Sequence, residues 1–596
     1  MQRLLGAIKG IAQGLLKAVS RFPLTVICLI VATSLVWYMI SLHKNPDIFI
    51  EKLLFTCLLG AFLGVAAQFS CERFERLAKL RLWVYVTAAL LVGAYYLSLG
   101  SSQSIEFDVQ IRTFVAVFAM FSLALFIPSY KNGFDFDSLA LIHFKAAFTS
   151  GLYSAVLSAG CASIIATIDI LLFNINEDAY AYTMSTIWIL FAVLYYLSLL
   201  PRFNSQAQAD REYAQNESNY PRLLEILVSY IAIPLVAVYT MVLVAYFIKI
   251  LVTLNWPAGQ LGPMVLAYSA AGLIIYILAG SLENRATLLY RLVFPKILIP
   301  IVIMQLVSVA IRLNAFGVTE SRYYVALFGL FSIVCAVLLS LKPMARNSLI
   351  VVLAAFFAIL SIIPPIDAFT VSRVSQTTRL EKMLQAEGIL VDGKIKPRAD
   401  VPMELRIEAT SILNYLQNRE YITGIDWLPA DFNIHEDMQK TLGFETAYPQ
   451  YPGQAKYFYA SMNMVDPIDI KGYDIMYTGH SYRGQGKNEI APVNFVADDV
   501  KYQLTVTRIS TRETIVAVKS ADGKELVATG LYDFTRSLRG VTEQSKGSLS
   551  PQEMTLVTEK NGAKLYVLFQ NVNITFGSGT DAGADYSFYI FFSAPE

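Results

Sequence analysis

Eleven apolar runs, each about long enough to cross a lipid bilayer, follow one another through the first 369 residues of the 596-residue chain. A helix needs about 20 apolar residues to cross a hydrocarbon core of about 30 Å. The runs are 22–42, 53–69, 82–99, 113–130, 147–173, 182–200, 227–254, 264–282, 297–315, 324–341 and 349–363. Only 16% of all residues are charged, against about 25% in soluble domains. The sequence therefore predicts a polytopic α-helical membrane protein with about eleven transmembrane helices, and it excludes a soluble multidomain protein.

The segment before the first run carries apolar residues at helical spacing together with four Lys and Arg residues. This pattern is typical of an amphipathic helix that lies on a membrane surface. The first run is too long for the core of a signal peptide, and no small-x-small cleavage site follows it. We therefore interpret it as a retained membrane helix.

The orientation follows from Lys and Arg, because cytoplasmic loops of membrane proteins are enriched in both. With a cytoplasmic N-terminus, eighteen of these cations in residues 1–369 fall on the cytoplasmic side and six on the other. The six are Lys44, Lys52, Arg112, Lys249, Arg312 and Arg322. An odd number of spans then sends the C-terminal part out of the cytoplasm.

Residues 370–596 have the charge density of a soluble domain and no run that could span a membrane. Gly388 and Pro402 bound two helical segments, and strands then flank the turns Asp522-Gly523 and Asn561-Gly562. We therefore expect three parts: an amphipathic cytoplasmic segment 1–21, a transmembrane helical domain 22–369 and an extracytoplasmic α+β domain 370–596.

Motifs of common enzyme classes are absent from the sequence. It contains no GxxxxGK[ST], HExxH or GxSxG pattern, and its five cysteines form no CxxC pair. We therefore predict no catalytic residue, no metal site and no cofactor, and the sequence leaves open whether the protein is an enzyme. The C-terminal part holds more acidic than basic residues, which excludes nucleic acid as a partner by charge.

The strongest candidate binding cluster is Arg312, Thr319, Glu320 and Arg322, at the outer ends of the ninth and tenth predicted spans. Arg312 and Arg322 lie on the predicted outer side, where Lys and Arg are otherwise scarce, and this position needs an explanation. They could bind a phosphate or carboxylate. They could instead form structural ion pairs with Glu320 and Asp169. We expect one arginine to be paired and the other to be free for an anionic small molecule or a lipid head group.

Two further candidates lie on the same predicted side. Asp169 precedes the end of the fifth span, where it fits either an ordinary helix end or a carboxylate that binds a cation or a substrate. Trp256 precedes Pro257 between the seventh and eighth spans. A tryptophan there fits a membrane–water interface as well as a binding site.

The Arg312 cluster also carries a family resemblance. Its pattern Arg…Phe-Gly-Val-Thr-Glu-Ser-Arg-Tyr resembles the Arg…Gly-Leu-Thr-x-x-Arg-Tyr signature of the bacterial family called domain of unknown function 4153, with Val318 in place of a commoner leucine. Other segments that resemble the family are Phe134 to Asp137 leading to Gly151, Tyr220-Pro221, Ile233-Pro234-Leu235, Tyr239, Trp256-Pro257-x-Gly259, and Ser375-Gln376-x-x-Arg379-Leu380 leading to Leu384. The resemblance covers about residues 110–390. It implies a polytopic protein of the bacterial inner membrane, and it implies no activity or catalytic residue.

Three functions fit these features. Many helices and polar groups gathered at one face favour transport or the handling of lipids and envelope components, with membrane lipids as partners. A membrane enzyme acting on a lipid-linked envelope substrate is the second. Membrane enzymes of that kind usually have a long, acidic first outer loop, whereas the predicted first outer loop of this chain holds only about ten residues. An envelope sensor or assembly factor is the third.

Overall fold

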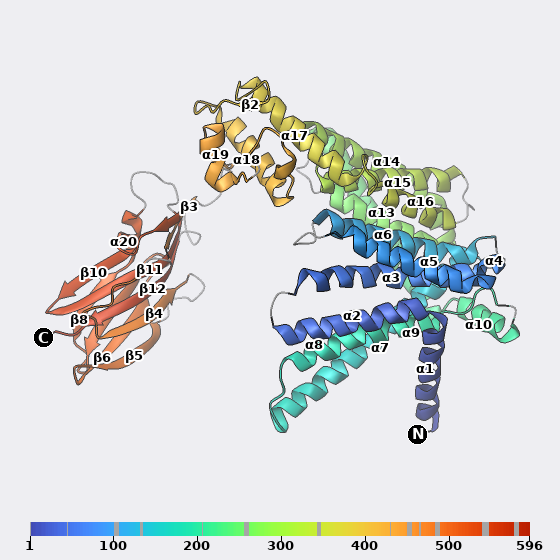
Figure 1. The fold of residues 1–596 in the computed structure, drawn as a ribbon, viewed down its shortest axis with the longest axis horizontal. Helices are drawn as coiled ribbons and strands as arrows, with labels where there is room; N and C mark the ends of the chain where they lie inside the picture. Colours follow the sequence, from blue (N-terminus) through green and yellow to red (C-terminus); the bar gives the residue numbers. More distant parts are fainter. Residues whose placement is uncertain are drawn as a thin grey trace. The chain divides into compact units, whose positions relative to one another are not determined.

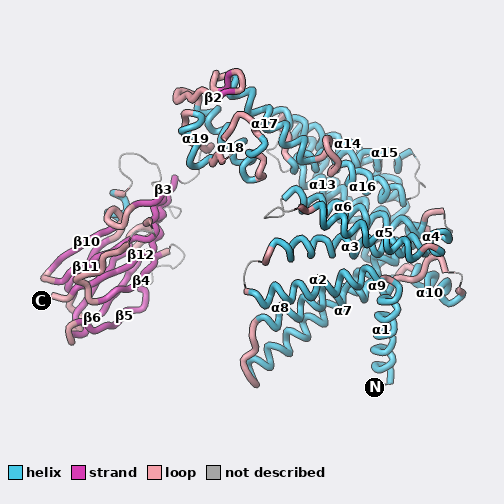
Figure 2. The backbone as a smooth tube through the Cα atoms, in the orientation of Figure 1, coloured by secondary structure: helices cyan, strands magenta, loops and turns pink. Residues whose placement is uncertain are grey.

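The computed structural model describes all residues except 1, 44–45, 101–106, 132–134, 206, 255–260, 342–346, 430, 450–455, 464–466, 483–488, 539–546, 577–582 and 596. The chain divides into two compact units, Met1–Tyr448 and Pro449–Glu596. The first unit is built of helices and the second mostly of strands (Figures 1 and 2).

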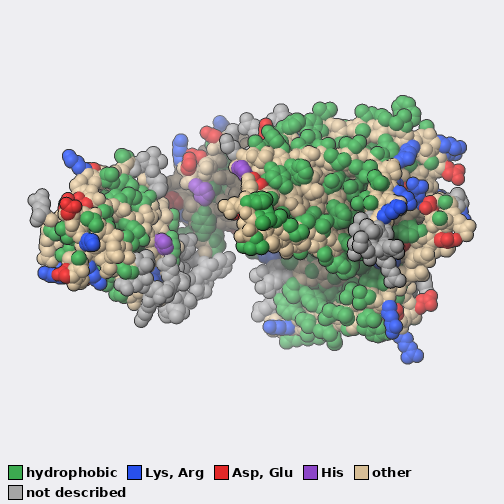
Figure 3. Space-filling view, turned by 90° about the horizontal axis from the view of Figure 1, so that it is seen from below, with side chains coloured by type: hydrophobic (Ala, Val, Ile, Leu, Met, Phe, Trp, Pro, Cys, Tyr) green, Lys and Arg blue, Asp and Glu red, His purple; other side chains and the backbone are tan. Residues whose placement is uncertain are grey.

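Among the described residues, the first unit contains ten helices that are long and apolar enough to cross a membrane. They are α2 (Pro23–Leu42), α3 (Ile48–Arg73), α5 (Arg81–Ser98), α6 (Phe107–Phe126), α7 (Phe136–Leu171), α8 (Asp178–Ser185) with α9 (Ala192–Leu199), α10 (Gln208–Ser218) with α11 (Arg222–Ile226) and α12 (Ile233–Thr253), α13 (Leu261–Leu278), α14 (Arg285–Phe316) and α15 (Glu320–Leu341). In Figure 3 hydrophobic side chains are spread widely over the visible face of this unit, and charged side chains gather toward its edge. The protein is a polytopic α-helical membrane protein, and the first ten predicted spans are confirmed.

The eleventh predicted run forms a shorter helix, α16 (Ser348–Leu360), of 13 residues. It rises only about 20 Å, less than a full span. Asn347, directly before α16, donates to Asp137 Oδ1 at 2.7 Å at the start of α7. Asp367, after α16, accepts a hydrogen bond from Arg112 near the start of α6 at 3.1 Å. α7 begins shortly after the end of α6, so Asn347 lies near the end of α6, whereas Asp367 lies near its beginning. The segment made of α16 and residues 361–367 therefore runs from the end of α6 back to the beginning of α6.

Two further helices, which are not among the ten spans, lie near the end of α6 that leads into α7. The predicted amphipathic segment is a helix, α1 (Gln2–Arg21), and Figure 1 shows it running across the direction of α2. The helix α4 (Glu75–Lys79) joins α3 to α5. The position of α1 on a membrane surface stays a prediction.

Three helices follow the spans and still belong to the first compact unit. They are α17 (Ala368–Ala386), α18 (Met403–Asn418) and α19 (Ile434–Leu442), with the two-residue strands β1 (Leu390–Val391) and β2 (Lys394–Ile395) between the first two. Gly388 with φ 69° follows α17, and Pro402 precedes α18, as predicted. The compact units thus divide at residue 448, whereas the sequence placed the boundary of the membrane domain at residue 369, where the apolar runs end.

The second unit is a sandwich of two antiparallel sheets. Its elements are β3 (Lys456–Met462), β4 (Ile475–Ser481), β5 (Glu489–Ala497), β6 (Val500–Arg508), β7 (Thr514–Ser520), β8 (Glu525–Gly530), α20 (Tyr532–Ser537), β9 (Gly547–Leu549), β10 (Thr555–Lys560), β11 (Ala563–Phe576) and β12 (Gly583–Ser593). One sheet has the order β4-β12-β11-β3-β9, with β10 also paired to β11 and only β9 parallel to its neighbour, and the other has the order β5-β6-β7-β8. Both predicted hairpins are confirmed, since Gly523 and Gly562 have positive φ and turn β7 into β8 and β10 into β11.

Both sheets contribute to one hydrophobic core, and this core should fold without the membrane helices. Phe588 of β12 is fully buried and lies over Gly479 of β4, where an added Cβ would be 2.4 Å from its ring. We predict that the fragment 449–596 is soluble and unfolds cooperatively. Phe588→Ala should lower the free energy of unfolding of this fragment by about 3–5 kcal/mol, the usual cost of truncating a buried phenylalanine to alanine.

The matched control is Met476→Ala on β4, because Met476 is 54% exposed. It should change the free energy of unfolding by less than about 0.5 kcal/mol in the same urea titration. Equal effects of the two substitutions would contradict the placement of Phe588 in the core.

Candidate functional site

The turn between α14 and α15 contains the predicted binding residues, and its backbone has a conformation that requires glycine. Gly317 follows the last residue of α14 with φ 68° and ψ 178°. This region of backbone conformation is essentially restricted to glycine. A Cβ at Gly317 would also lie 2.8 Å from Gln376 Nε2 of α17. Both the turn and the close approach of α17 therefore depend on this glycine.

Side chains of α17 bind the backbone at the end of α14. Gln376 Nε2 donates to the carbonyl oxygens of Phe316 at 3.0 Å and Val318 at 2.8 Å. Ser375 Oγ accepts a hydrogen bond from the Val318 amide at 2.9 Å. The last carbonyls of a helix have no partner inside that helix. These bonds satisfy them and fix α17 to the end of α14.

Two arginines complete this contact, which we call the α14–α17 clamp. Arg379 Nη2 of α17 donates to the carbonyl oxygen of Ala315 at 2.9 Å, and Arg379 also pairs with Glu408 of α18. Arg322 Nη1 of α15 donates to the carbonyl oxygens of Phe316 at 3.0 Å and Gly317 at 2.8 Å. Arg322 therefore binds the backbone of its own turn, and its role in binding an anion stays a prediction.

The ion pairs expected from the sequence are not formed among the described residues. Neither Glu320 nor Asp169 pairs with Arg312 or Arg322, and Arg312 makes no hydrogen bond or ion pair there. Thr319 Oγ1 lies 3.3 Å from Ser321 Oγ, within the turn. A role of Arg312 or Thr319 in binding an anion stays a prediction.

Glu320 is buried and contacts the segment after α18. Its Oε1 accepts a hydrogen bond from the Tyr421 hydroxyl at 3.0 Å, and its Oε2 lies 3.7 Å from Arg419 Nε. The same hydroxyl lies 3.0 Å from Asp108 Oδ1 of α6. Burial, together with the charges of Glu320 and Asp108, raises the pKa of Tyr421, so that the hydroxyl remains a donor. These residues link α6 and α15 to the helices after the spans.

A second buried contact fixes the start of α17. Asp367 is fully buried, and its Oδ1 accepts hydrogen bonds from the amides of Phe369 and Thr370 and from Arg112 of α6, each at 3.1 Å. Burial acts to raise the pKa of Asp367, but the hydrogen bonds from Thr370 and the charge of Arg112 outweigh it and hold this pKa below its ordinary value. The carboxylate is thus both the N-cap of α17 and an anchor to the spans.

The other two candidates do not join this cluster. Asp169 is exposed, and its Oδ1 accepts a hydrogen bond from the Ile175 amide at 2.7 Å, which closes the turn after α7. Figure 1 places that turn, next to α8, at the opposite edge of the helical unit from α14 and α15. Trp256 lies outside the described residues, as does Phe134 of the family pattern.

Sequence reasoning did not find the cavities among the spans. One of about 620 Å³ lies among α3, α6, α7 and α9, and aromatic and aliphatic side chains such as Phe62, Phe118 and Trp188 line it. His143 and Tyr196 supply polar groups in its lining, with His143 Nδ1 2.6 Å from the Tyr196 hydroxyl. The buried Nε2 of His143 has no partner among the described residues.

A second apolar cavity, of about 500 Å³, lies on another side of α6, among α13, α15 and α16. The two cavities share Phe118, Phe121 and Leu125 as lining residues, so α6 forms a wall between them. None of Arg312, Glu320, Arg322 and Asp169 lines either cavity. Apolar lining residues look like any helix core in a sequence, and this is why no motif indicated these cavities.

Comparison with known proteins assigns the family. A model of the family described as "Domain of unknown function (DUF4153)" matches residues 30–393, more than half of the chain. The chain belongs to this family. It is also 27% identical over 166 residues to the uncharacterized protein PM1469 of Pasteurella multocida (strain Pm70). That alignment covers 27% of each of the two chains. No solved structure is similar to the chain at a significant level.

The part shared with the DUF4153 family coincides with the spans and their clamp. The match begins inside α2 and ends at the β1–β2 turn, so it contains all lining residues of both apolar cavities except Thr25, and both sides of the α14–α17 clamp. The β-sandwich lies outside it. The two family patterns recognised in the sequence, around Arg322 and around Gln376, are therefore the two halves of one structural contact.

The different surroundings of the two arginines predict different effects of their removal. Arg322→Ala deletes hydrogen bonds from a charged donor to two carbonyls and should lower the free energy of unfolding by about 1.5–3 kcal/mol. Arg312→Ala deletes no such contact and should change it little. The thermal unfolding midpoint of the full-length protein in detergent measures the difference. A larger loss from Arg312→Ala than from Arg322→Ala would show that the roles are reversed.

Proposed function

We propose that this DUF4153 protein binds a long-chain amphiphile of the membrane in its apolar cavities and serves in transport or in the handling of lipids or envelope components. The cavity of about 620 Å³ carries this proposal. Ligand sites typically measure about 300–1,000 Å³, and apolar side chains with a few placed polar groups line them. An acyl or isoprenoid chain fits such a lining, whereas a water-soluble substrate does not.

The His143–Tyr196 pair supplies the polar groups that a binding site needs. His143 is 6% exposed, and the rings of Phe69 and Phe203 pack against it. Its Nε2 is buried without a partner among the described residues, and we propose that a hydroxyl or carboxyl group of a bound amphiphile supplies this partner. The rival functions, a membrane enzyme acting on a lipid-linked substrate or an envelope sensor, lack a comparable observation.

We further propose that the protein lies in the bacterial inner membrane with a cytoplasmic N-terminus and an extracytoplasmic β-sandwich. The excess of Lys and Arg on one side supports this orientation. The path of α16 supports it too, because a chain that returns to the beginning of α6 leaves the bundle on the side opposite the N-terminus. Arg312 then lies on the outer side, where we propose it as a contact for an anionic small molecule or lipid head group.

Gly151 of α7 offers a way to fill the first cavity. It lines the cavity, and a Cβ added there meets no atom within 4 Å. Gly151→Phe should therefore fold normally and occupy the space of the ligand. We expect the affinity of the purified protein for a fluorescent long-chain fatty acid to fall about tenfold or more, which corresponds to about 1.4 kcal/mol.

The matched control is Gly160→Phe on the same helix. Gly160 also has open space around it, but it is exposed and lines neither cavity. This variant should bind the probe like the wild type. If both variants bind it equally well, the cavity is not the binding site and the proposed function fails.

The orientation predicts the location of reporter fusions. Fusions after residues 80, 210 and 345 should report a cytoplasmic location, because each follows an even number of spans. Fusions after residues 105, 260 and 400 should report an extracytoplasmic location. A cytoplasmic signal after residue 400 would contradict the crossing by α16, and inverted signals at all positions would contradict the orientation alone.

A further inference from the structure

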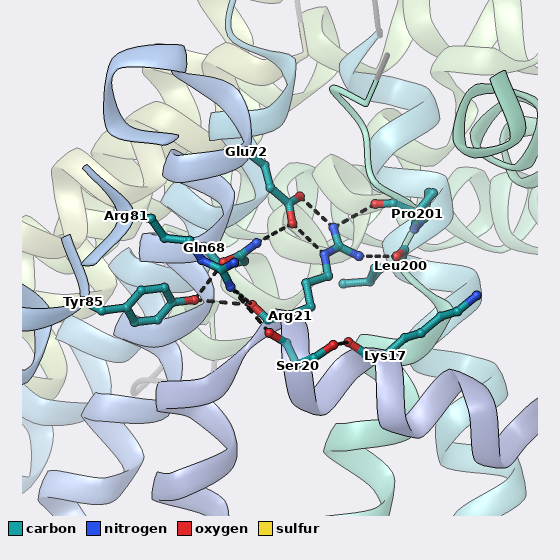
Figure 4. A network of polar contacts seen from close by, with 9 residues as sticks. All are labelled: Lys17, Ser20, Arg21, Gln68, Glu72, Arg81, Tyr85, Leu200 and Pro201. Atoms are coloured by element: carbon teal, nitrogen blue, oxygen red, sulfur yellow. Dashed lines mark hydrogen bonds and ion pairs between the residues drawn. The ribbon is translucent and has the colours of Figure 1, made fainter. Parts of the chain in front are cut away.

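A buried ion pair joins α1, α3 and the loop after α9, at the end of the helical unit that carries α4. Figure 4 shows Arg21 between Glu72 and the carbonyl groups of Leu200 and Pro201. Its Nε and Nη2 bind the two carboxylate oxygens of Glu72 at 2.7 and 2.8 Å, and its Nη1 donates to Leu200 O at 2.5 Å. Gln68 donates a further hydrogen bond to Glu72 at 2.7 Å. The charge of Glu72 is thus already neutralised by Arg21.

Two hollows flank this pair. A polar pocket of about 340 Å³ is lined by Gln68, Glu72, Arg81, Arg202 and Asn204, among others. A groove of about 710 Å³ runs along α1 between α9 and α10. Arg202 lines both hollows, and Lys17 lines the groove.

Apart from Arg21, the cations that line the two hollows have no acidic partner among the described residues. Arg81 Nη2 lies 3.5 and 3.3 Å from the carbonyl oxygens of Ser20 and Arg21, and its guanidinium lies 5.6 Å from the centre of the Tyr85 ring. Arg202 and Lys17 make no side-chain hydrogen bond or ion pair with the described part of the chain. Asp210, in the groove, is the single acid there to offset them. The hollows therefore hold an excess of positive charge.

From this geometry we infer that the polar pocket binds a phosphate group through Arg81 and Arg202, with the phosphate supplied by an anionic membrane lipid. Guanidinium groups bind phosphate oxygens in pairs. Ser205, which also lines the pocket, adds a hydroxyl group for a further oxygen. α1 runs across α2 and borders the groove beside the pocket, as a helix in the head-group layer would do (Figure 1).

This site is separate from the apolar cavities, so it can exist whether or not they bind a chain. The test is native mass spectrometry of the full-length protein with phosphatidylglycerol, with phosphatidylethanolamine and with inorganic phosphate. We expect the wild type to prefer phosphatidylglycerol. Arg81→Gln and Arg202→Gln should each weaken that binding about fivefold, the effect of one cation facing an anionic head group.

Arg222→Gln is the matched control, because Arg222 is exposed near the same end of the bundle and lines neither hollow. It should keep the preference for phosphatidylglycerol, as should Gly151→Phe, which tests the apolar cavity alone. Arg202→Gln removes no hydrogen bond or ion pair within the described part of the chain, and it keeps the test valid if Arg81→Gln fails to fold. Competition by inorganic phosphate would identify the phosphate as the group recognised. Binding of inorganic phosphate without phosphatidylglycerol would show a free anion as its source and overturn the lipid assignment. An unchanged preference in Arg202→Gln would overturn the proposal.

Discussion

The carbonyl groups at the end of a membrane helix need partners, and in this protein one such end determines how the later helices pack. α14 ends at a turn whose backbone is bound by Gln376 and Arg379 of α17 and by Arg322 of α15. The turn can exist only with Gly317, because its φ and ψ exclude other residues. The position of α17, and of the helices that follow it, depends on this clamp.

Buried carboxylates continue the connection that the clamp begins. Asp367 fixes the first turn of α17 to Arg112 of α6, and Glu320 of α15 contacts Tyr421 beyond α18. Breaking such a contact leaves an uncompensated buried charge, which costs several kcal/mol. This explains why the segment 370–448, soluble by composition, belongs to the same compact unit as the spans.

Local patterns in the sequence predicted most of the fold. Ten apolar runs became helices of membrane length, and the turns at Gly523 and Gly562 formed the expected hairpins. The eleventh run is a shorter helix, because a length of apolar sequence does not reveal where the backbone leaves the helix. Local patterns did not predict which residues the buried carboxylates contact. Tyr421 lies 101 residues from Glu320 and 313 residues from Asp108, and only the folded chain brings them together.

The residues that line the two apolar cavities look like a helix core in the sequence, but in the folded chain several of them remain exposed. The larger cavity is open at its side, and its lining residues Phe114, Phe118 and Trp188 are each about half exposed, so that in water this apolar surface would cost about 25 cal/mol per Å². A fold held at both ends of α6, by Asp137 with Asn347 and by Arg112 with Asp367, resists collapse into that space. In a bilayer, the apolar chains of the membrane cover such a surface. The open apolar lining is thus an argument for contact with lipid chains that does not depend on any motif.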